Sequence, residues 1–360
     1  MVKRKTIVFI TGSLSNGGAE RVISILASGC ADMGHDVTLV VLRSGVCSYN
    51  VSNNVRIIQI EEDGKKSVLG RVLALRNVLK KKKCDAVIPF LPIISLYTLA
   101  ANIGLHKYII MSERADPRAK LNNLPLKDKI GNFFIRKLCF LGFADKIVFQ
   151  TKDAQCFYPN FIQKKSVIIP NPLDDTNLPN KFCGKRDNKI IAAGRLSEEK
   201  NFPLLIEAFS EFYLEHPDYS LWIYGEGPMR CNLEQMISDL GLKDVIHLPG
   251  FTGNLQIIMN TAALYVSTSN HEGISNVMLE ALGMGVPTIV TDCPVGGARM
   301  YVKTNYNGIL IKMNSKNELL NSMKKIIEDK DYCKSITNHN EEIRHDLSRE
   351  VICSKWIDII

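Results

Sequence analysis

The sequence predicts an α/β protein made of two doubly wound domains. A chain of 360 residues is long for a single hydrophobic core, so two domains of ordinary size are expected. Short apolar runs alternate with segments of helical periodicity, as in repeated strand and helix units. Glycines, cations and paired carboxylates follow several of the apolar runs. Because open α/β sheets bind ligands at the carboxyl ends of their strands, a ligand site is expected there.

Composition excludes several classes of protein. The chain is 46% hydrophobic and 23% charged, which is typical of a globular protein, and no apolar run reaches the roughly 20 residues of a membrane span. The strand after Met1–Lys5 is too short for a signal peptide, so we expect a cytoplasmic protein. Ten cysteines without a C-x-x-C pair indicate neither a disulfide framework nor a zinc site. The net charge of +8 suits nucleic acid, anionic lipid or a diphosphate, and does not separate them.

The first domain is expected over residues 1–172. An apolar strand, Thr6 to Thr11, leads through Gly17, Gly18 and Glu20 into a helix that runs to about Met33. Glycines at such a junction allow the backbone to approach a phosphate or a sugar. A plain tight turn is equally compatible, and the spacing is not that of a dinucleotide site. Further strands are expected at 36–42, 55–60, 86–91, 107–111, 144–151 and 167–169.

Three segments of this half leave two interpretations open. Lys80–Lys83 end a helix, where solvated lysines suit the helix dipole, although a contact with anionic inner-membrane lipid is the alternative. Leu126–Leu141 is predicted as an amphipathic helix, and packing against the core is favoured over membrane binding. The loop Ser112–Pro117 is either an exposed loop with salt bridges or the place where Glu113 and Arg114 face a ligand.

Pro170-Asn171-Pro172 breaks regular structure and predicts a linker over 173–188, before a second domain over 189–340. Here Gly194, Arg195 and Lys200 lie on a strand-to-helix loop, where two cations would neutralise a diphosphate. An ordinary ion-pair loop is the alternative.

The central stretch follows the strand 264–269. Glu272 precedes a turn at Gly273, and the free N–H groups of residues 274–277, at the start of a helix, suit an anion. Glu280 lies about two turns further on, so the two carboxylates can reach two ends of one ligand. The alternative is an N-terminal charge and a solvated surface residue. The D-x-D sequence at Asp329–Asp331 lies away from the strand ends, so no metal site is expected.

Ser112-Glu113-Arg114 resembles a loop of the bacterial polysaccharide, capsule and O-antigen type of glycosyltransferase family 4, and four further motifs resemble those of the retaining glycosyltransferases of that family. They are Glu272 and Glu280 at E-x7-E spacing, Gly194-Arg195 with Lys200, Pro170-Asn171-Pro172, and Gly17-Gly18-Ala19-Glu20. The resemblance implies the GT-B fold, with two Rossmann-like domains facing a central cleft. It also implies that the last helix, within 341–360, crosses back to the first domain.

The resemblance also implies roles for single residues. Arg195 and Lys200 would stabilise the leaving diphosphate, and Glu272 would orient the sugar. Residues expected to bind the nucleotide-sugar are Gly17, Gly18, Gly194, Phe251, Thr252, Ile274, Ser275, Asn276, Val277 and Glu280. Residues expected near the acceptor are Glu20, Glu113 and Arg114. The chain departs from the family at Ile274-Ser275, where Phe-Pro is common, and at Met300, where Glu is common.

The activity implied is transfer of a hexose or N-acetylhexosamine, with retention, from a UDP-sugar to a glycan or a polyprenyl-diphosphate-linked acceptor. No metal, other cofactor or nucleic acid is expected to take part. Two alternatives remain, a nucleotide-sugar epimerase of the same fold and a non-catalytic nucleotide- or sugar-binding protein.

Overall fold

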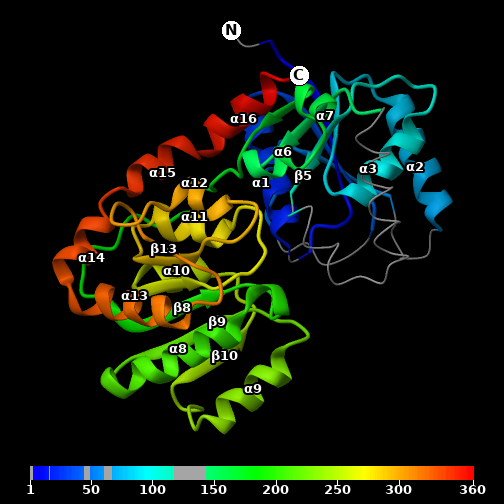
Figure 1. Cartoon of the computed structure of the whole chain (residues 1–360). Coiled ribbons are helices and arrows are strands. Elements are labelled where there is room, and N and C mark those ends of the chain that lie inside the picture. The colour runs from blue at the N-terminus through cyan, green and yellow to red at the C-terminus, as the bar shows by residue number, and fades with distance from the viewer. Residues whose placement is uncertain (1–2, 16, 44–48, 61–66, 115, 117–142) are drawn as a thin grey trace. The chain divides into compact units, whose positions relative to one another are not determined.

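The computed structural model describes residues 3–15, 17–43, 49–60, 67–114, 116 and 143–360. It divides into two compact units, one formed by residues 1–174 and 347–360 and the other by residues 175–346. Both units are built on parallel sheets flanked by helices (Figure 1), which confirms the predicted α/β class. The helix expected over Leu126–Leu141 lies outside the described residues.

The described part of the first unit contains seven strands in two parallel sheets. One sheet has the order β3-β2-β1-β4 and the next has the order β5-β6-β7. Two single parallel bridges, Val87 with Ile109 and Phe90 with Ser112, join the segment of β4 to the segment of β5 and so link the two sheets. The strands are β1 (Thr6–Thr11), β2 (Asp36–Val41), β3 (Arg56–Gln59), β4 (Ala86–Pro89), β5 (Ile110–Glu113), β6 (Lys146–Phe149) and β7 (Ser166–Ile168). Most are continuous apolar runs because helices cover both faces of such sheets.

The described helices of this unit include the last one of the chain. They are α1 (Gly18–Asp32), α2 (Val68–Lys81), α3 (Pro92–Asn102), α6 (Lys152–Cys156), α7 (Asn160–Lys164) and α16 (Arg349–Ile357). Helix α16 packs on α1, and a Cβ on Gly29 would lie 2.5 Å from Cys353 Sγ, so glycine permits this close approach. Arg349 and Asp32 join the two helices by an ion pair of 3.1 Å. The end of the chain thus returns to the first unit (Figure 1).

The second unit is one parallel sheet of six strands in the order β10-β9-β8-β11-β12-β13. This order reverses direction between β8 and β11, as in a Rossmann sheet. The strands are β8 (Asp187–Ala193), β9 (Ser220–Tyr224), β10 (Ile246–Gly250), β11 (Ala262–Ser267), β12 (Thr288–Thr291) and β13 (Ile309–Ile311).

Helices flank this second sheet. They are α8 (Phe202–Glu215), α9 (Arg230–Asp239), α10 (Leu255–Asn260), α11 (Asn276–Gly283), α12 (Gly297–Tyr301), α13 (Lys316–Glu328), α14 (Lys330–Ile336) and α15 (Asn340–Asp346). Phe209 and Phe212 of α8 anchor a core that extends to Leu319 and Met323 of α13. Within the described ranges, no helix is both long and apolar enough to span a bilayer.

The last helix lies within residues 341–360, as expected, and it is preceded by a separate helix. Helix α15 ends at Asp346 and belongs to the second unit, whereas α16 begins after Ser348 and belongs to the first. Ser348 Oγ accepts a hydrogen bond from Val351 N at 3.4 Å and so caps the new helix. The return to the first unit therefore occurs at residues 346–348.

Candidate active site

The carboxyl edge of the second sheet holds the central stretch and the Arg195 loop. The loop after β8 carries Arg195 and Lys200, and the loop after β11 carries Glu272. Strands β8 and β11 are neighbours at the point where the strand order reverses. In open α/β sheets this reversal leaves a crevice between diverging connections, and ligands bind there.

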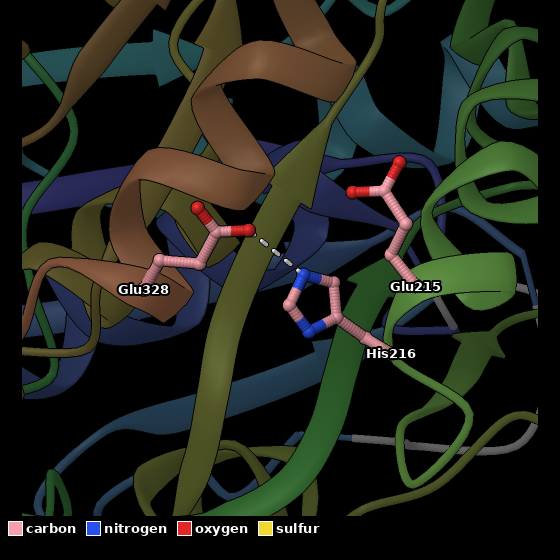
Figure 2. Close-up of side chains that lie close together, drawn as sticks. All are labelled: Glu215, His216 and Glu328. Carbon is pink, nitrogen blue, oxygen red and sulfur yellow. Dashed lines mark hydrogen bonds and ion pairs between the residues drawn. The ribbon is translucent and has the colours of Figure 1, made fainter.

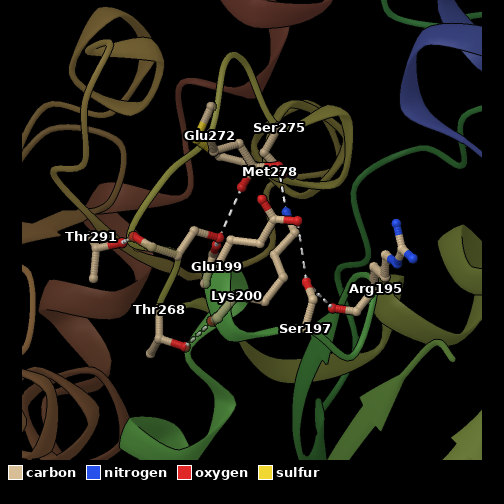
Figure 3. A network of polar contacts seen from close by, with 11 residues as sticks. Arg195, Ser197, Glu199, Lys200, Thr268, Glu272, Ser275, Met278 and Thr291 are labelled. Carbon is tan, nitrogen blue, oxygen red and sulfur yellow. Dashed lines mark hydrogen bonds and ion pairs between the residues drawn. The ribbon is translucent and has the colours of Figure 1, made fainter. Parts of the chain in front are cut away.

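Lys200 and Glu272 are paired directly. Lys200 Nζ lies 2.6 Å from Glu272 Oε1, and each side chain is 19% exposed. Ser269 Oγ donates to the other carboxylate oxygen, Glu272 Oε2, at 2.9 Å. Figure 3 shows both partners reaching the same point from different loops. A half-buried pair held in this way places a cation and a carboxylate beside one ligand position.

Backbone contacts fix the two loops to each other. Thr268 Oγ1 donates to the carbonyl oxygens of Lys200 and Asn201, at 3.0 and 2.9 Å. Asn270 N donates to Glu199 O at 2.8 Å, and Thr291 Oγ1 donates to Ser269 O at 2.5 Å. The Lys200 and Glu272 backbones are therefore positioned by their neighbours rather than by the ion pair itself.

The turn before α11 packs against the loop after β12, and the contact leaves no room for a side chain at residue 297. A Cβ on Gly297 would lie 1.8 Å from Gly273 O, so glycine at 297 lets the loop after β12 support the turn that carries Glu272. A cavity of about 10 Å³, with room for about one water molecule, lies behind this turn. Its lining includes Ser267, Ser269 and Glu272.

Helix α11 opens beside Glu272. Ser275 caps it, its Oγ accepting from Met278 N at 3.4 Å. This chain has Ile274-Ser275 where Phe-Pro is common in the family, and Ser275 supplies the capping side chain. Glu280 is only 3% exposed, and Gln256 Nε2 donates to its Oε1 at 3.1 Å. The interpretation of Glu280 as a solvated surface residue is therefore wrong, because this carboxylate faces inward.

Two buried groups near Glu272 were not identified from the sequence. Burial, together with the nearby Glu272 carboxylate, raises the pKa of the Cys293 thiol to about 12. The same two causes, burial first, raise the pKa of Tyr265. Cys293 is thus a protonated thiol at neutral pH and a poor nucleophile. The sequence held a clue to both residues, since Tyr265 lies in β11, just before the Glu272 motif, and Cys293 follows β12, the next strand.

Three other predicted site residues lie at the same edge of the sheet and are accessible to solvent, namely Arg195, Phe251 and Thr252. Arg195 and Phe251 are exposed and Thr252 is half-buried, and Arg195 points away from the Lys200–Glu272 pair in Figure 3. The Arg195 loop itself is held, since Leu196 N donates to Glu226 O and Met229 N donates to Leu196 O, at 3.0 and 2.9 Å. A Cβ on Gly225 would lie 2.0 Å from Gly194 O, so Gly225 lets the β8 and β9 loops touch.

In the first unit, the glycine loop is the N-terminus of α1. Gly17 is its N-cap residue, and Gly17 N donates to the Tyr49 hydroxyl at 3.2 Å. A Cβ on Gly17 would lie 2.1 Å from the Glu20 carboxylate, so this acid lies directly against the loop. Burial raises the pKa of Glu20. The sequence-predicted Gly17, Gly18 and Glu20 are thus brought together at one helix start.

Glu113 and Arg114 are in the interior instead of on an exposed loop. Glu113 belongs to β5, and its Oε2 accepts from the Tyr158 hydroxyl at 3.1 Å. The Arg114 guanidinium lies 5.1 Å from the Phe90 ring centre and 5.4 Å from that of Trp356. It also donates to Asn171 Oδ1 at 3.1 Å. The exposed salt-bridged loop considered above is therefore wrong, because aromatic rings enclose this arginine.

Among the described residues, one group has metal-ligand geometry, formed by Glu215, His216 and Glu328 (Figure 2). It lies at the ends of α8 and α13, and α8 ends just before the amino end of β9, at the edge of the sheet opposite the Lys200–Glu272 pair. Glu215 is bound to Lys324 at 2.7 Å, and His216 Nε2 to Glu328 at 3.0 Å. These contacts are typical of surface ion pairs.

The D-x-D sequence has a structural role. Asp329 caps α14, with its Oδ1 accepting from Tyr332 N at 2.9 Å. A capping carboxylate is satisfied by the backbone and needs no metal to explain it.

Both halves of the chain match models of known protein families. The model of glycosyl transferases group 1 matches residues 175–343, and that of glycosyltransferase family 4 matches residues 16–177. One relative is the Campylobacter jejuni GalNAc-alpha-(1->4)-GalNAc-alpha-(1->3)-diNAcBac-PP-undecaprenol alpha-1,4-N-acetyl-D-galactosaminyltransferase, 26% identical over 98% of both chains. Another is the amylovoran biosynthesis glycosyltransferase AmsD of Erwinia amylovora, 24% identical over 99% of both chains.

Among solved structures, Anabaena HepE in complex with UDP and glucose superposes with a TM-score of 0.85 at 18% identity, covering 99% of both chains. This likeness supports the predicted GT-B class of fold. The two family models together span residues 16–343, almost the whole chain, and meet at the boundary between the two units. The chain therefore belongs to the group 1 glycosyltransferases of family 4 and is a retaining glycosyltransferase of the GT-B fold.

Proposed function

We propose that this glycosyltransferase moves a hexose or N-acetylhexosamine from a UDP-sugar to a hydroxyl of a glycan carried on a polyprenyl diphosphate, in the synthesis of a cell-surface polysaccharide. The observation that carries the proposal is the Lys200–Glu272 pair at the reversal of the second sheet, beside the start of α11. The relatives' names support the substrates, since one names an undecaprenol-linked glycan and another amylovoran, and the HepE structure holds UDP.

In this proposal the diphosphate binds at the start of α11. The N–H groups of Ile274 to Val277 and the positive end of the helix favour an anion there. Lys200 turns from Glu272 to a phosphate oxygen when the nucleotide-sugar binds, and the exposed Arg195 folds over the same group. Gly194 lets its loop lie against the phosphates. Glu280 accepts hydrogen bonds from the ribose hydroxyls, and Phe251 and Thr252 contact the base.

The reaction breaks the bond between the anomeric carbon and the diphosphate oxygen. The acceptor hydroxyl oxygen forms the new bond to that carbon on the same face, and its proton passes to the departing phosphate oxygen. Lys200 and Arg195 stabilise the negative charge that accumulates on the diphosphate. Glu272 orients the sugar ring. The nearby Cys293 thiol is protonated at neutral pH, so it supplies no nucleophile.

The acceptor is assigned to the first unit. Glu20 lies against Gly17 at the start of α1, and its carboxylate would accept a hydrogen bond from an acceptor hydroxyl. Gly17 and Gly18 add no side chains of their own, so the backbone there can approach a ligand closely. Glu113 and Arg114 are buried, so they would affect the acceptor only indirectly.

Calorimetric titration with uridine, guanosine and adenosine diphosphates tests the site. We expect UDP to bind selectively and Lys200→Ala to weaken it at least tenfold, because a charge-assisted hydrogen bond contributes about 1.5–3 kcal/mol. Glu280→Gln, which preserves volume at a buried position, should weaken UDP but not inorganic diphosphate. Lys243→Ala, at an exposed lysine of the same unit, is the control. Binding indifferent to both Lys200 and Glu280 contradicts the assignment.

A transfer assay then separates the possible activities. Incubation with a UDP-sugar and a polyprenyl-diphosphate glycan should lengthen the glycan by one α-linked sugar and release UDP. Release of an epimerised UDP-sugar without acceptor would instead identify an epimerase. Tight UDP-sugar binding with no turnover on any acceptor would identify a binding protein.

A further inference from the structure

The carboxylate of Glu280 is oriented by a side chain from another helix. Glu280 lies in the second turn of α11, and only 3% of the residue is exposed. A buried carboxylate has to be hydrogen-bonded, because the loss of water without a new partner is costly. Gln256 of α10 is such a partner, with its Nε2 donating to Glu280 Oε1 at 3.1 Å. The direction of the carboxylate therefore depends on where α10 places this amide.

The backbone of Gln256 is itself anchored. Gln256 is half-buried in the first turn of α10, and this helix packs against α11 and β11. Met259, three residues further on, is fully buried. Before the helix, Asn254 N donates to Thr252 Oγ1 at 3.2 Å, so the loop with Phe251 and Thr252 leads directly into α10. Gln256 thus connects the segment assigned to the base with the carboxylate assigned to the ribose.

The bond from Gln256 does not neutralise the carboxylate. Gln256 carries no charge, and α10 contains no charged residue. Glu272, by contrast, faces the cation of Lys200. A carboxylate has about four acceptor sites, so Glu280 can accept from Gln256 and from two vicinal hydroxyls at the same time. A neutral amide therefore orients this group and leaves its charge to strengthen the bonds from a ribose.

We propose that Gln256 is a positioning residue for the nucleotide-sugar and sets the preference of the site for ribose over deoxyribose. Its amide holds the Glu280 carboxylate in the orientation that accepts from the ribose hydroxyls. The inference rests on the proposed function, in which Glu280 binds the ribose. Without the amide, the carboxylate samples other rotamers, so the hydroxyls lose a preorganised partner while the diphosphate keeps its own contacts.

Calorimetric titration of Gln256→Ala with UDP, 2′-deoxy-UDP and inorganic diphosphate tests the proposal. We expect the affinity for UDP to fall about three- to tenfold, which is the usual effect of losing one neutral side-chain hydrogen bond. The affinity for 2′-deoxy-UDP should fall less, and the affinity for inorganic diphosphate should not change. The preference for UDP over 2′-deoxy-UDP should therefore narrow, a result that a general loss of structure would not produce.

Gln235→Ala is the matched control. Gln235 is exposed on α9, and its Nε2 donates to Asp239 Oδ1 at 2.7 Å. The control thus removes an amide-to-carboxylate bond of the same kind from a helix to which no donor contact is assigned. It should bind UDP, 2′-deoxy-UDP and inorganic diphosphate as the wild type does. Thermal melting of both variants checks that they are folded at the temperature of the titration.

A double-mutant cycle shows whether Gln256 acts through Glu280. Glu280→Ala removes the carboxylate and should weaken UDP at least about tenfold, because hydrogen bonds to a charged group are the stronger ones. Adding Gln256→Ala to Glu280→Ala should then cause no further loss, since the amide has no carboxylate left to orient. If the double variant loses the full effect of both single changes, Gln256 acts independently of Glu280 and the proposal is overturned.

Steady-state rates supply a second readout. Gln256→Ala should raise the KM for the UDP-sugar and leave kcat near the wild-type value, because the ribose is bound equally in the ground state and the transition state. If Glu280→Ala weakens UDP but Gln256→Ala binds it as tightly as Gln235→Ala does, this inference alone fails. Unchanged UDP affinity in Glu280→Ala would overturn the ribose assignment of the proposed function, and this inference with it.

Discussion

Single side chains at the edge of the second sheet differ in how firmly they are held. Glu272 is positioned through both carboxylate oxygens, by Lys200 and by Ser269. Arg195 is exposed on a loop whose backbone is fixed by Glu226 and Met229. A fixed carboxylate suits a group that orients a sugar, whereas a free arginine suits one that closes over a diphosphate.

Arg195→Ala should therefore reduce activity without weakening the fold. We expect turnover to fall by about 100-fold or more, because one group that stabilises developing charge contributes about 3 kcal/mol. The melting temperature should stay at the wild-type value, since the side chain is exposed. Initial rates of UDP release with saturating acceptor measure the effect, with Lys243→Ala as the control. Near-normal turnover would remove Arg195 from the mechanism.

At the scale of elements, the turn between β11 and α11 depends on the loop after β12. Gly297 lies under Gly273, and the cap at Ser275 begins α11 immediately after it. The position of Glu272 is thus set by a contact between two loops, and not only by its own segment.

Gly297→Ala tests this support. Its new Cβ would lie 1.8 Å from Gly273 O, so the turn must move; we expect a loss of about 1–3 kcal/mol in the free energy of unfolding, as for other overpacked sites. UDP affinity should fall as well, because Glu272 and the start of α11 move with the turn. Gly253→Ala is the stability control, since nothing lies within 4 Å of its Cβ. Equal unfolding curves for the two variants would contradict the packing argument.

At the scale of the whole molecule, the return of the chain to the first unit is fixed by α16. Its Trp356 is fully buried and its ring centre lies 6.1 Å from that of Phe90. Arg114 contacts both rings and also binds Asn171, just before the crossing to the second unit. Near that crossing, Leu173 N donates to Leu347 O at 2.7 Å. Arg114 thus connects both segments that pass between the units. Burial lowers its pKa to about 9, which leaves it charged at neutral pH.

Trp356→Ala should destabilise the first unit by about 3–5 kcal/mol, the usual range for a large aromatic side chain removed from a core. Trp356→Phe keeps a ring beside Phe90 and should cost clearly less. Denaturant unfolding followed by circular dichroism gives both values. If Trp356→Ala unfolds within about 0.5 kcal/mol of wild type, which is the usual scatter of surface substitutions, α16 does not hold the crossing.

The sequence by itself determined most of the described elements, their order and the loops that carry the candidate residues. A strand, the loop after it and the start of the next helix are contiguous, so apolar runs, glycines and the Glu272 and Glu280 spacing could be identified locally. The family followed from those motifs. The expected return of the last helix to the first domain is confirmed, but its starting point at Ser348 was not apparent from the sequence, because it depends on α16 packing against α1, a contact with a distant segment.

Only the tertiary structure decided which side chains meet and which are buried. Lys200 and Glu272 are 72 residues apart, and they pair because β8 and β11 became neighbours in the sheet. Glu280 and Arg114 are charged residues that local patterns place in solvent, yet Gln256 and two aromatic rings enclose them. Burial depends on what packs from elsewhere in the chain, and a local pattern carries no record of that.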